Sequence, residues 1–199
     1  MSVSLLREAR AELYDRSEAV ALGVNGWDEY AQYIRFIKGE GIDVRQCQRF
    51  CGLVAVLGIV IDPPVFEFHD GGEAGVVIEV LGDDSETIID LCAWSLVRPE
   101  KHATMFGNAI GLGGYQIANP ATYFAGQHLQ VHRTPLAWLK AGCAGVVILN
   151  RIGASDWLGS AKLIAAEDQS HGRELAKTLR GVIPPDRILI PRSTIQAAA

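Results

Sequence analysis

Polar side chains directly follow the apolar runs in the last third of the chain. They are His132 and Arg133 after HLQV, Asn150 and Arg151 after GVVIL, Glu167 and Asp168 after KLIAA, and Arg192 after RILIP. The carboxyl ends of parallel strands share one edge of a sheet, and open α/β sheets usually build their ligand sites there. If these runs are parallel strands, we expect their polar groups to meet at one edge.

The tightest titratable group is formed by Glu167, Asp168 and His171, at the junction between an apolar run and a polar, helix-like segment. Carboxylates at such a place bind Mg²⁺ through oxygen, and a histidine transfers protons, so an enzyme would use His132 or His171 for that step. The alternative needs no chemistry, because Asp168 or Ser170 caps the helix and Glu167 favours its positive end. The sequence favours capping.

Arg133, Asn150 and Arg151 are the candidate ligand-binding residues, because guanidinium groups bind phosphates and carboxylates through paired hydrogen bonds. Residues 1–125 carry nine Lys and Arg against 18 Asp and Glu, whereas residues 126–199 carry nine against five. The later part therefore permits an anionic ligand, although the two parts could instead neutralise each other across an internal interface. An acidic first part and a mildly basic later part argue against a protein that coats nucleic acid, because such proteins usually have a strongly basic face.

Two other groups of potential metal ligands receive structural interpretations. His128 and His132 have HxxxH spacing, but along a strand four residues of about 3.3 Å each separate them by roughly 13 Å, too far for one ion. We therefore assign no metal site there. The four cysteines, Cys47, Cys51, Cys92 and Cys143, form no CxxC motif, and we expect them to be reduced and buried.

The elements that must position these residues follow from the spacing of apolar side chains. It predicts a first helix over 4–22 and a second over 27–39 with Asn25 as its N-cap, and Asp43 offers a cap for a third. The apolar run at 50–61 is too short to cross a membrane and predicts a buried core segment. The amino terminus lacks the order of a secretory signal, so we expect a cytoplasmic location.

Residues 63–125 predict an antiparallel β-meander followed by a long loop. Turn signals HDGGE and GDDS separate three strand-like runs, at 65–68, 74–81 and 86–94. A two-residue turn at Asp83 and Asp84 would make Glu79 and Asp90 diagonal neighbours on one face. Nearby carboxylates can divide acid and base roles, with His102 within reach, although a sheet face with acids near its rim is the simpler interpretation.

The rest of this part carries weaker signals. Pro99 suits the first turn of a short helix containing His102, Met105 and Phe106. The Gly-rich stretch that follows, at 107–126, predicts a long irregular connection.

Residues 126–199 predict a βαββαβ section. Thr134 is the expected N-cap of a helix with Pro135 in its first turn, and tryptophans 138 and 157 are expected in the core. KLIAA predicts a strand followed by a helix, with one continuous helix over 155–180 as the alternative. We therefore expect a single α/β or α+β domain, in which a helical part over 1–62 packs on a mixed sheet of the meander and the last strands.

The element order from His128 to Pro191, with EDQSHGRELA after an apolar strand, resembles the Toprim fold of primases and topoisomerases. That family ends its third strand in a DxDxxG-like acidic pattern. Aligned on Gly172, Glu167 matches the first acid and Gln169 stands at the second, while His132 and Arg133 replace the glutamate after the first strand. The resemblance covers about a third of the chain and implies a degenerate Toprim-like domain linked to nucleic-acid metabolism, in which these departures put the family's metal-dependent nicking or primase activity in doubt.

The sequence contains no GxxxxGK[ST], no GxGxxG after a strand, no GxSxG and no HExxH. Because each catalytic group has a structural interpretation, the leading hypothesis is a non-catalytic accessory or interaction protein. Its partner is left open between a protein and, less favoured, a nucleic acid. The rival is a metal-dependent enzyme, or a binding domain for a phosphorylated or anionic ligand. In that rival Glu167 and Asp168 bind Mg²⁺, His132 or His171 transfers protons, and the arginines hold the anion.

Overall fold

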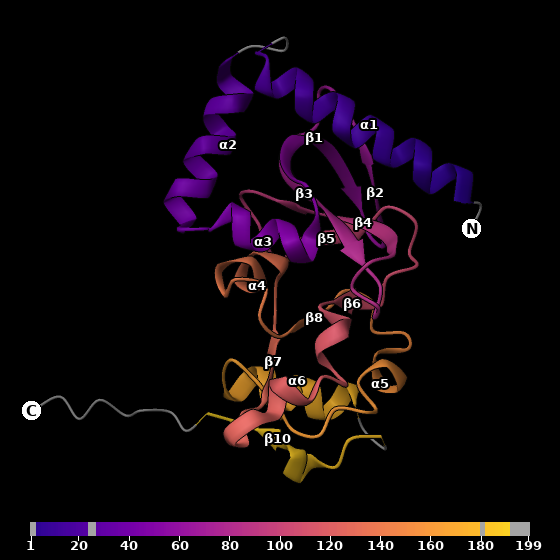
Figure 1. Ribbon diagram of the computed structural model, residues 1–199, viewed down its shortest axis with the longest axis vertical. Coiled ribbons are helices and arrows are strands. Elements are labelled where there is room, and N and C mark those ends of the chain that lie inside the picture. Colours follow the sequence, from indigo (N-terminus) through magenta and orange to yellow (C-terminus); the bar gives the residue numbers. More distant parts are fainter. Residues whose placement is uncertain (1–2, 24–26, 180–181, 192–199) are drawn as a thin grey trace, which may run out of the picture.

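The computed structural model describes residues 3–23, 27–179 and 182–191, so Asn25 and Arg192 lie outside the described residues. At one end of the molecule three amino-terminal helices pack against a closed β-barrel, and at the other end lies a second sheet with its own helices (Figure 1). The mixed α/β class is confirmed, with the strands divided between these two sheets. None of the described helices is long and apolar enough to cross a membrane.

The predicted amino-terminal helices are present. Helix α1 spans Val3–Ala21, α2 spans Trp27–Glu40 and α3 spans Val44–Cys51. The side chain of Asp43 accepts a hydrogen bond from the Gln46 backbone N–H, which confirms it as the N-cap of α3. The second helix continues past its predicted end at residue 39 and stops at Gly41, whose φ of +67° breaks helical geometry.

Five strands close the barrel in the order β1-β2-β5-β4-β3. They are β1 (Val54–Asp62), β2 (Val65–Phe68), β3 (Glu73–Leu81), β4 (Ile88–Ser95) and β5 (His102–Thr104). Strand β1 corrects the assignment of 1–62 to a helical part. It is rich in β-branched residues, and consecutive side chains from Val54 to Leu57 are buried against different clusters on its two faces.

The pairing of the strands differs from a simple meander. Strand β2 returns antiparallel along β1, with Ile59 opposite Phe68, and also pairs with β5 in parallel; it does not neighbour β3. The predicted short helix after Pro99 is wrong, because residues 102–104 form β5, with Ala103 opposite Ala93 on β4. These residues find strand partners only because the barrel closes, and the spacing of neighbouring residues in the sequence does not indicate such partners.

The turn between β3 and β4 is wider than predicted. The Gly82 N–H donates to Thr87 O, and the Asp84 carboxylate accepts from the Glu86 and Thr87 N–H groups, so the loop spans several residues and the ladder shifts register near Leu81. The pairs are therefore Val80 with Asp90, and Glu79 with Leu91. Successive residues of a strand point to opposite faces of the sheet. Because Glu79 is paired with Leu91, and Asp90 with Val80, the two carboxylates lie on opposite faces rather than together.

The second sheet has the order β10-β9-β7-β8-β6, parallel except for the edge strand β6. Its strands are β6 (Gly111–Leu112), β7 (Leu129–His132), β8 (Val146–Ile148), β9 (Ile164–Ala165) and β10 (Ile188–Leu189). The helices between them are α4 (Pro135–Lys140), α5 (Ala154–Trp157) and α6 (Gln169–Thr178). The predicted parallel section is thus confirmed, and 155–180 is a strand between helices rather than one helix.

The long connection at 107–126 is not wholly irregular. It contains β6 and two 3₁₀ turns, η1 (Gly114–Gln116) and η2 (Pro120–Gly126). Glycine is required at Gly111, because a Cβ there would lie 2.3 Å from Val147 O and 2.2 Å from the Trp157 ring. The absence of a side chain lets this segment pair tightly with β8 and complete the sheet.

The barrel and the parallel sheet share one apolar core. Trp138 of α4 and Val147 of β8 belong to the same buried cluster as Val54, Ile78 and Trp94 of the barrel. All four cysteines are free and buried, as expected. The barrel and the parallel sheet are therefore in direct contact through this cluster, and residues of both can line a space between them.

Candidate functional site

The strand order places a crevice at the carboxyl ends of β7 and β9. The chain leaves β7 through α4 to reach β8 on one side, whereas β9 lies on the other side of β7 and leads through α6 to β10. Ligands of open α/β sheets bind where the strand order reverses in this way. The predicted residues at these two strand ends do meet, since His132 Nδ1 lies 3.4 Å from Glu167 Oε1.

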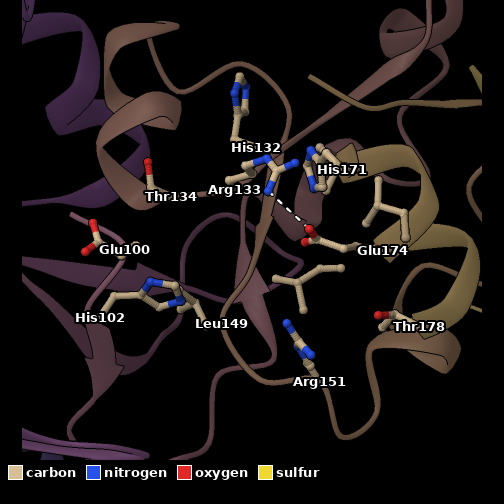
Figure 2. A pocket seen from close by; sticks show the side chains of 13 residues that line it. Glu100, His102, His132, Arg133, Thr134, Leu149, Arg151, His171, Glu174 and Thr178 are labelled. Atoms are coloured by element: carbon tan, nitrogen blue, oxygen red, sulfur yellow. Dashed lines mark hydrogen bonds and ion pairs between the residues drawn. The ribbon is translucent and has the colours of Figure 1, made fainter. Parts of the chain in front are cut away.

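Arg133 is at the centre of this edge and contacts three carboxylates. Its Nη2 donates to Asp168 Oδ1 at 2.9 Å and its Nη1 to Glu174 Oε1 at 3.3 Å, while Nε lies 3.7 Å from Glu167 Oε2. Figure 2 shows the guanidinium between His132 and His171, directed toward Glu174. The positive charge of Arg133 is therefore already shared among three acids of this edge.

Asp168 serves as the N-cap of α6. Its Oδ1 accepts a hydrogen bond from the His171 backbone N–H at 2.8 Å, and this bond, together with the one from Arg133, lowers the pKa of the Asp168 carboxyl. The predicted capping role is confirmed for Asp168 rather than for Ser170, whose hydroxyl contacts Glu174 at 3.4 Å. A carboxylate held in this way is ionised, and its main partners are fixed by the fold.

Glu167 and His171 also have structural partners. Glu167 Oε1 accepts from the Arg133 backbone N–H at 3.3 Å, and the Glu167 N–H donates to His171 Nδ1 at 3.3 Å. Because Nδ1 accepts, the proton of the neutral ring is on Nε2. Burial lowers the pKa of His171, and the nearby Arg133 charge lowers it further, so the imidazole is neutral at neutral pH.

A cavity of about 360 Å³ opens beside this cluster, between the barrel and the parallel sheet. Its walls come from β5, the ends of β7 and β8, and α6, and include Glu100, His102, Val131, His132, Arg133, Thr134, Ile148, Leu149, Arg151, His171, Glu174, Leu175 and Thr178 (Figure 2). The volume falls in the range of roughly 300–1,000 Å³ that is typical of small-molecule sites.

The three candidate ligand-binding residues divide between the cavity and a loop. Arg133 and Arg151 both line the cavity, and the Arg151 side chain has no polar partner within the described chain. Asn150 does not line it; its Oδ1 instead accepts from the Ile152 N–H at 2.9 Å, in a turn of its own loop. Arg151 is thus the available cation of this edge.

Sequence reasoning missed several cavity residues. His102 comes from the barrel strand β5, its Nδ1 is buried without a hydrogen-bond partner, and burial lowers its pKa despite a bond to the Glu100 backbone. Glu174 and Thr178 come from the face of α6 that follows the Asp168 cap. The i, i+4 spacing from Ser170 through Glu174 to Thr178 signalled that helix face, whereas nothing local signalled His102.

The other predicted carboxylate pair does not form a site. Glu79 is 2% exposed and accepts from Arg10 Nε at 2.7 Å and from the Leu53 N–H at 3.3 Å. Asp90 is fully buried on the opposite face, where it accepts backbone N–H groups from the segment after β5. Each acid holds a different part of the barrel in place, and the two do not divide acid and base roles.

Metal-binding groups are absent from the described ranges, in which no three His, Cys, Asp or Glu side chains are placed to hold one ion. His128 precedes β7 and His132 ends it. Cys143 joins Cys47 and Cys51 in the shared core, where Cys47 Sγ contacts Leu139 O at 3.5 Å and Cys143 Sγ contacts Cys47 O at 3.9 Å. Hydrogen bonding and burial raise the pKa of the Cys47 thiol, so it is protonated.

Compared with protein-family models, curated proteins and solved structures, the chain has no match in any of the three.

Proposed function

We propose that this protein is a non-catalytic binding or accessory protein, in which Arg133 locks the sheet edge where an α/β enzyme would place its metal and acid. One observation supports this proposal above the others: a single guanidinium contacts Glu167, Asp168 and Glu174. Carboxylate oxygens are the ligands that divalent cations prefer. Here they neutralise a cation that belongs to the chain.

Electrostatics explains why the lock opposes metal binding. Two like unit charges 4 Å apart repel by about 4 kcal/mol at an effective dielectric constant of 20, and a divalent ion doubles that value. A Mg²⁺ ion at Glu167 and Asp168 would have to displace the Arg133 side chain or accept this repulsion. His171 adds no acid function at neutral pH, because its ring nitrogen accepts a bond from the Glu167 N–H.

A direct test replaces the locking cation. We expect Mg²⁺ and Mn²⁺ to produce no saturable shift in the melting temperature of the wild-type protein. In the Arg133→Gln variant the three carboxylates lack their cation, so we expect their side chains to turn toward a metal ion and such a shift to appear, because a metal that binds only the native state raises its stability. Arg173→Gln removes an exposed charge from the same helix, α6, and is the matched control.

Two outcomes would count against the lock. A saturable Mg²⁺ shift in the wild-type protein that Glu167→Ala abolishes would favour the metal-dependent alternative. An Arg133→Gln protein that folds but binds neither ion would show that Arg133 is not what keeps cations out.

The second candidate function is a metal-dependent enzyme or a degenerate Toprim-like domain linked to nucleic-acid metabolism. Two contacts at the end of β7 in the parallel sheet favour it: Glu167 lies beside His132, and Asp168 beside Arg133. In this function Mg²⁺ is the cofactor, His132 or His171 transfers protons, and Arg151 holds the anion. Nucleic-acid binding would weaken steeply with salt, and affinity that is insensitive to ionic strength would exclude that mode.

We further propose that the protein acts in the cytoplasm together with a protein partner. Four free, buried cysteines suit a reducing compartment, in which thiols stay unpaired. The first part of the chain, with 18 Asp and Glu against nine Lys and Arg among residues 1–125, carries a net negative charge that a basic partner would complement.

A further inference from the structure

We propose that the cavity between the barrel and the parallel sheet binds a small organic oxyanion, with its phosphate or carboxylate group on Arg151 and an apolar body against the cavity floor. This inference deepens the proposed binding role and rests on it. It concerns a different cation from the lock, so the two can fail separately.

The charges of the cavity wall single out Arg151. Among the lining residues, Arg133 is neutralised by Glu174 at 3.3 Å and by two further acids outside the cavity. Arg151 also lines the cavity, but its side chain contacts no acid of the described chain. A planar guanidinium in this position has its full set of donors free, and these donors match the two oxygens of a carboxylate or phosphate.

The wall opposite the sheet carries an acid without a cation beside it, which opposes an anion. Glu100 on the barrel side of the cavity is exposed, and its carboxylate has no partner among the described residues. Figure 2 shows Glu100 and Arg151 coming from different sides of the space, with His102 between them. An anion on Arg151 is therefore attracted by an adjacent unpaired cation and repelled more weakly by a separate acid across the cavity.

Neutral donors complete the polar part of the site. His171 accepts at Nδ1 from the Glu167 N–H, so its Nε2–H is left as a donor without a partner in the described structure. The Thr178 hydroxyl lines the same cavity and likewise makes no hydrogen bond to described residues. Both can donate to an oxyanion, which has more acceptor sites than one arginine can occupy.

The floor of the cavity is apolar and explains why the ligand should be organic. Side chains of Val131, Ile148, Leu149 and Leu175 line it. Val131 and Leu175 are buried in the core of the parallel sheet, so this surface is held rigidly. A purely inorganic ion would leave it in contact with water, whereas an apolar ligand body would remove it from water, at about 25 cal/mol for each Å² buried.

Calorimetric titration of the full chain tests the proposal with three probes of similar size: phenyl phosphate, benzoate and phenol. We expect at least one of the two anions to bind, and neutral phenol to bind more weakly. Arg151→Ala should weaken binding of that anion by about tenfold to a hundredfold, since a charge-assisted pair is lost. The two anionic arms distinguish a phosphate site from a carboxylate site.

Matched variants test whether the probe binds in the cavity. Arg173→Ala removes another exposed arginine that does not line it and should leave affinity unchanged. Glu100→Gln should strengthen binding a few-fold by removing the opposing charge, at an effective dielectric constant near that of water. Thr178→Phe fills the cavity from the end of α6 while leaving Arg151 in place, and should abolish binding.

The proposal is overturned if neither anion binds the wild-type protein, or if a bound anion is equally well held by the Arg151→Ala variant. Phenol binding as tightly as the anions would also overturn it, since charge would then play no part. None of these results depends on whether Mg²⁺ binds at Glu167 and Asp168, so the proposed function would have to be judged by its own titration.

Discussion

The barrel and the parallel sheet both gather acidic side chains, but they use them in different environments. In the barrel, Asp90 is 0% exposed and Glu79 is 2% exposed. At the edge of the parallel sheet, the side chains of Asp168 and Glu174 are 57% and 51% exposed around Arg133. The barrel acids are therefore enclosed by the fold, whereas the sheet acids face a cavity and solvent.

The difference in burial separates structural from functional acids. A buried carboxylate interacts strongly with its donors, because little water screens it, and its loss leaves those donors unsatisfied. The acids around Arg133 are screened by water, so breaking their pairs costs little stability. Changes to the acids of the sheet edge can thus alter binding without unfolding the protein, whereas the loss of a buried barrel acid destabilises the fold.

Asp90→Ala should produce the largest loss of stability in the molecule. The Asp90 carboxylate accepts backbone N–H groups of Leu91, Phe106, Asn108 and Ala109, at 2.7–3.2 Å. We expect the free energy of unfolding, measured by urea denaturation, to fall by more than about 3 kcal/mol, because these donors lose their acceptor. The free energy of unfolding should fall less in the Asp90→Asn variant, which keeps one acceptor oxygen.

An exposed barrel acid provides the control for this measurement. The Asp70 side chain is 88% exposed and is paired with Arg16 at the surface. Asp70→Ala should cost less than about 1 kcal/mol, as surface ion pairs usually do. Equal losses for Asp90→Ala and Asp70→Ala would show that burial is not what distinguishes the acids.

A double-mutant cycle on Arg10 and Glu79 should give the next largest effect. Arg10 of α1 donates to the buried Glu79 carboxylate at 2.7 Å. We expect a coupling energy of about 1–3 kcal/mol, because the pair holds the first helix on the barrel with one partner desolvated. The same cycle on the exposed pair Arg133 and Glu174 should give less than about 1 kcal/mol.

A reversed order in these two cycles would contradict the contrast between the regions. Coupling at Arg133 and Glu174 as large as at Arg10 and Glu79 would mean that the sheet edge is a structural centre as well.

The sequence predicted the parallel section well because its signals are local. Thr134 and Asp168 are N-caps whose side chains bond the next turn, and each follows closely after an apolar run. Once the runs are parallel strands, the meeting of His132 with Glu167 follows from the rule that carboxyl ends share an edge. The predicted capping role of Asp168 needed no tertiary information either.

The barrel was harder to predict because its register depends on a loop. The Asp84 side chain organises a wide turn, and the resulting shift sends Glu79 and Asp90 to opposite faces. No periodicity in the strands records the length of that turn. His102 was assigned to a helix for a related reason, since only the closed barrel gives it a strand partner, Trp94.

The smallest of the predicted effects is a dependence of stability on pH that involves one histidine from each region. Burial lowers the pKa of His102 on β5 and of His171 on α6 below the usual value. In the unfolded chain both titrate near 6.5. As the pH falls below that value, the unfolded state takes up protons before the native state does, so the free energy of unfolding decreases.

We expect stability to be highest above about pH 6.5 and to decline toward pH 5, with the slope measured by urea denaturation at several pH values. His102→Gln and His171→Gln should each flatten this slope. His102 should contribute more, because no carboxylate is among the causes of its shift, whereas Glu167, Glu174 and Asp168 all stabilise the cation of His171. A larger contribution of His171 than of His102 to this slope would show that Arg133 neutralises the acids at the sheet edge. That result would support the proposed role of Arg133 and contradict the view that these acids act differently from the barrel acids.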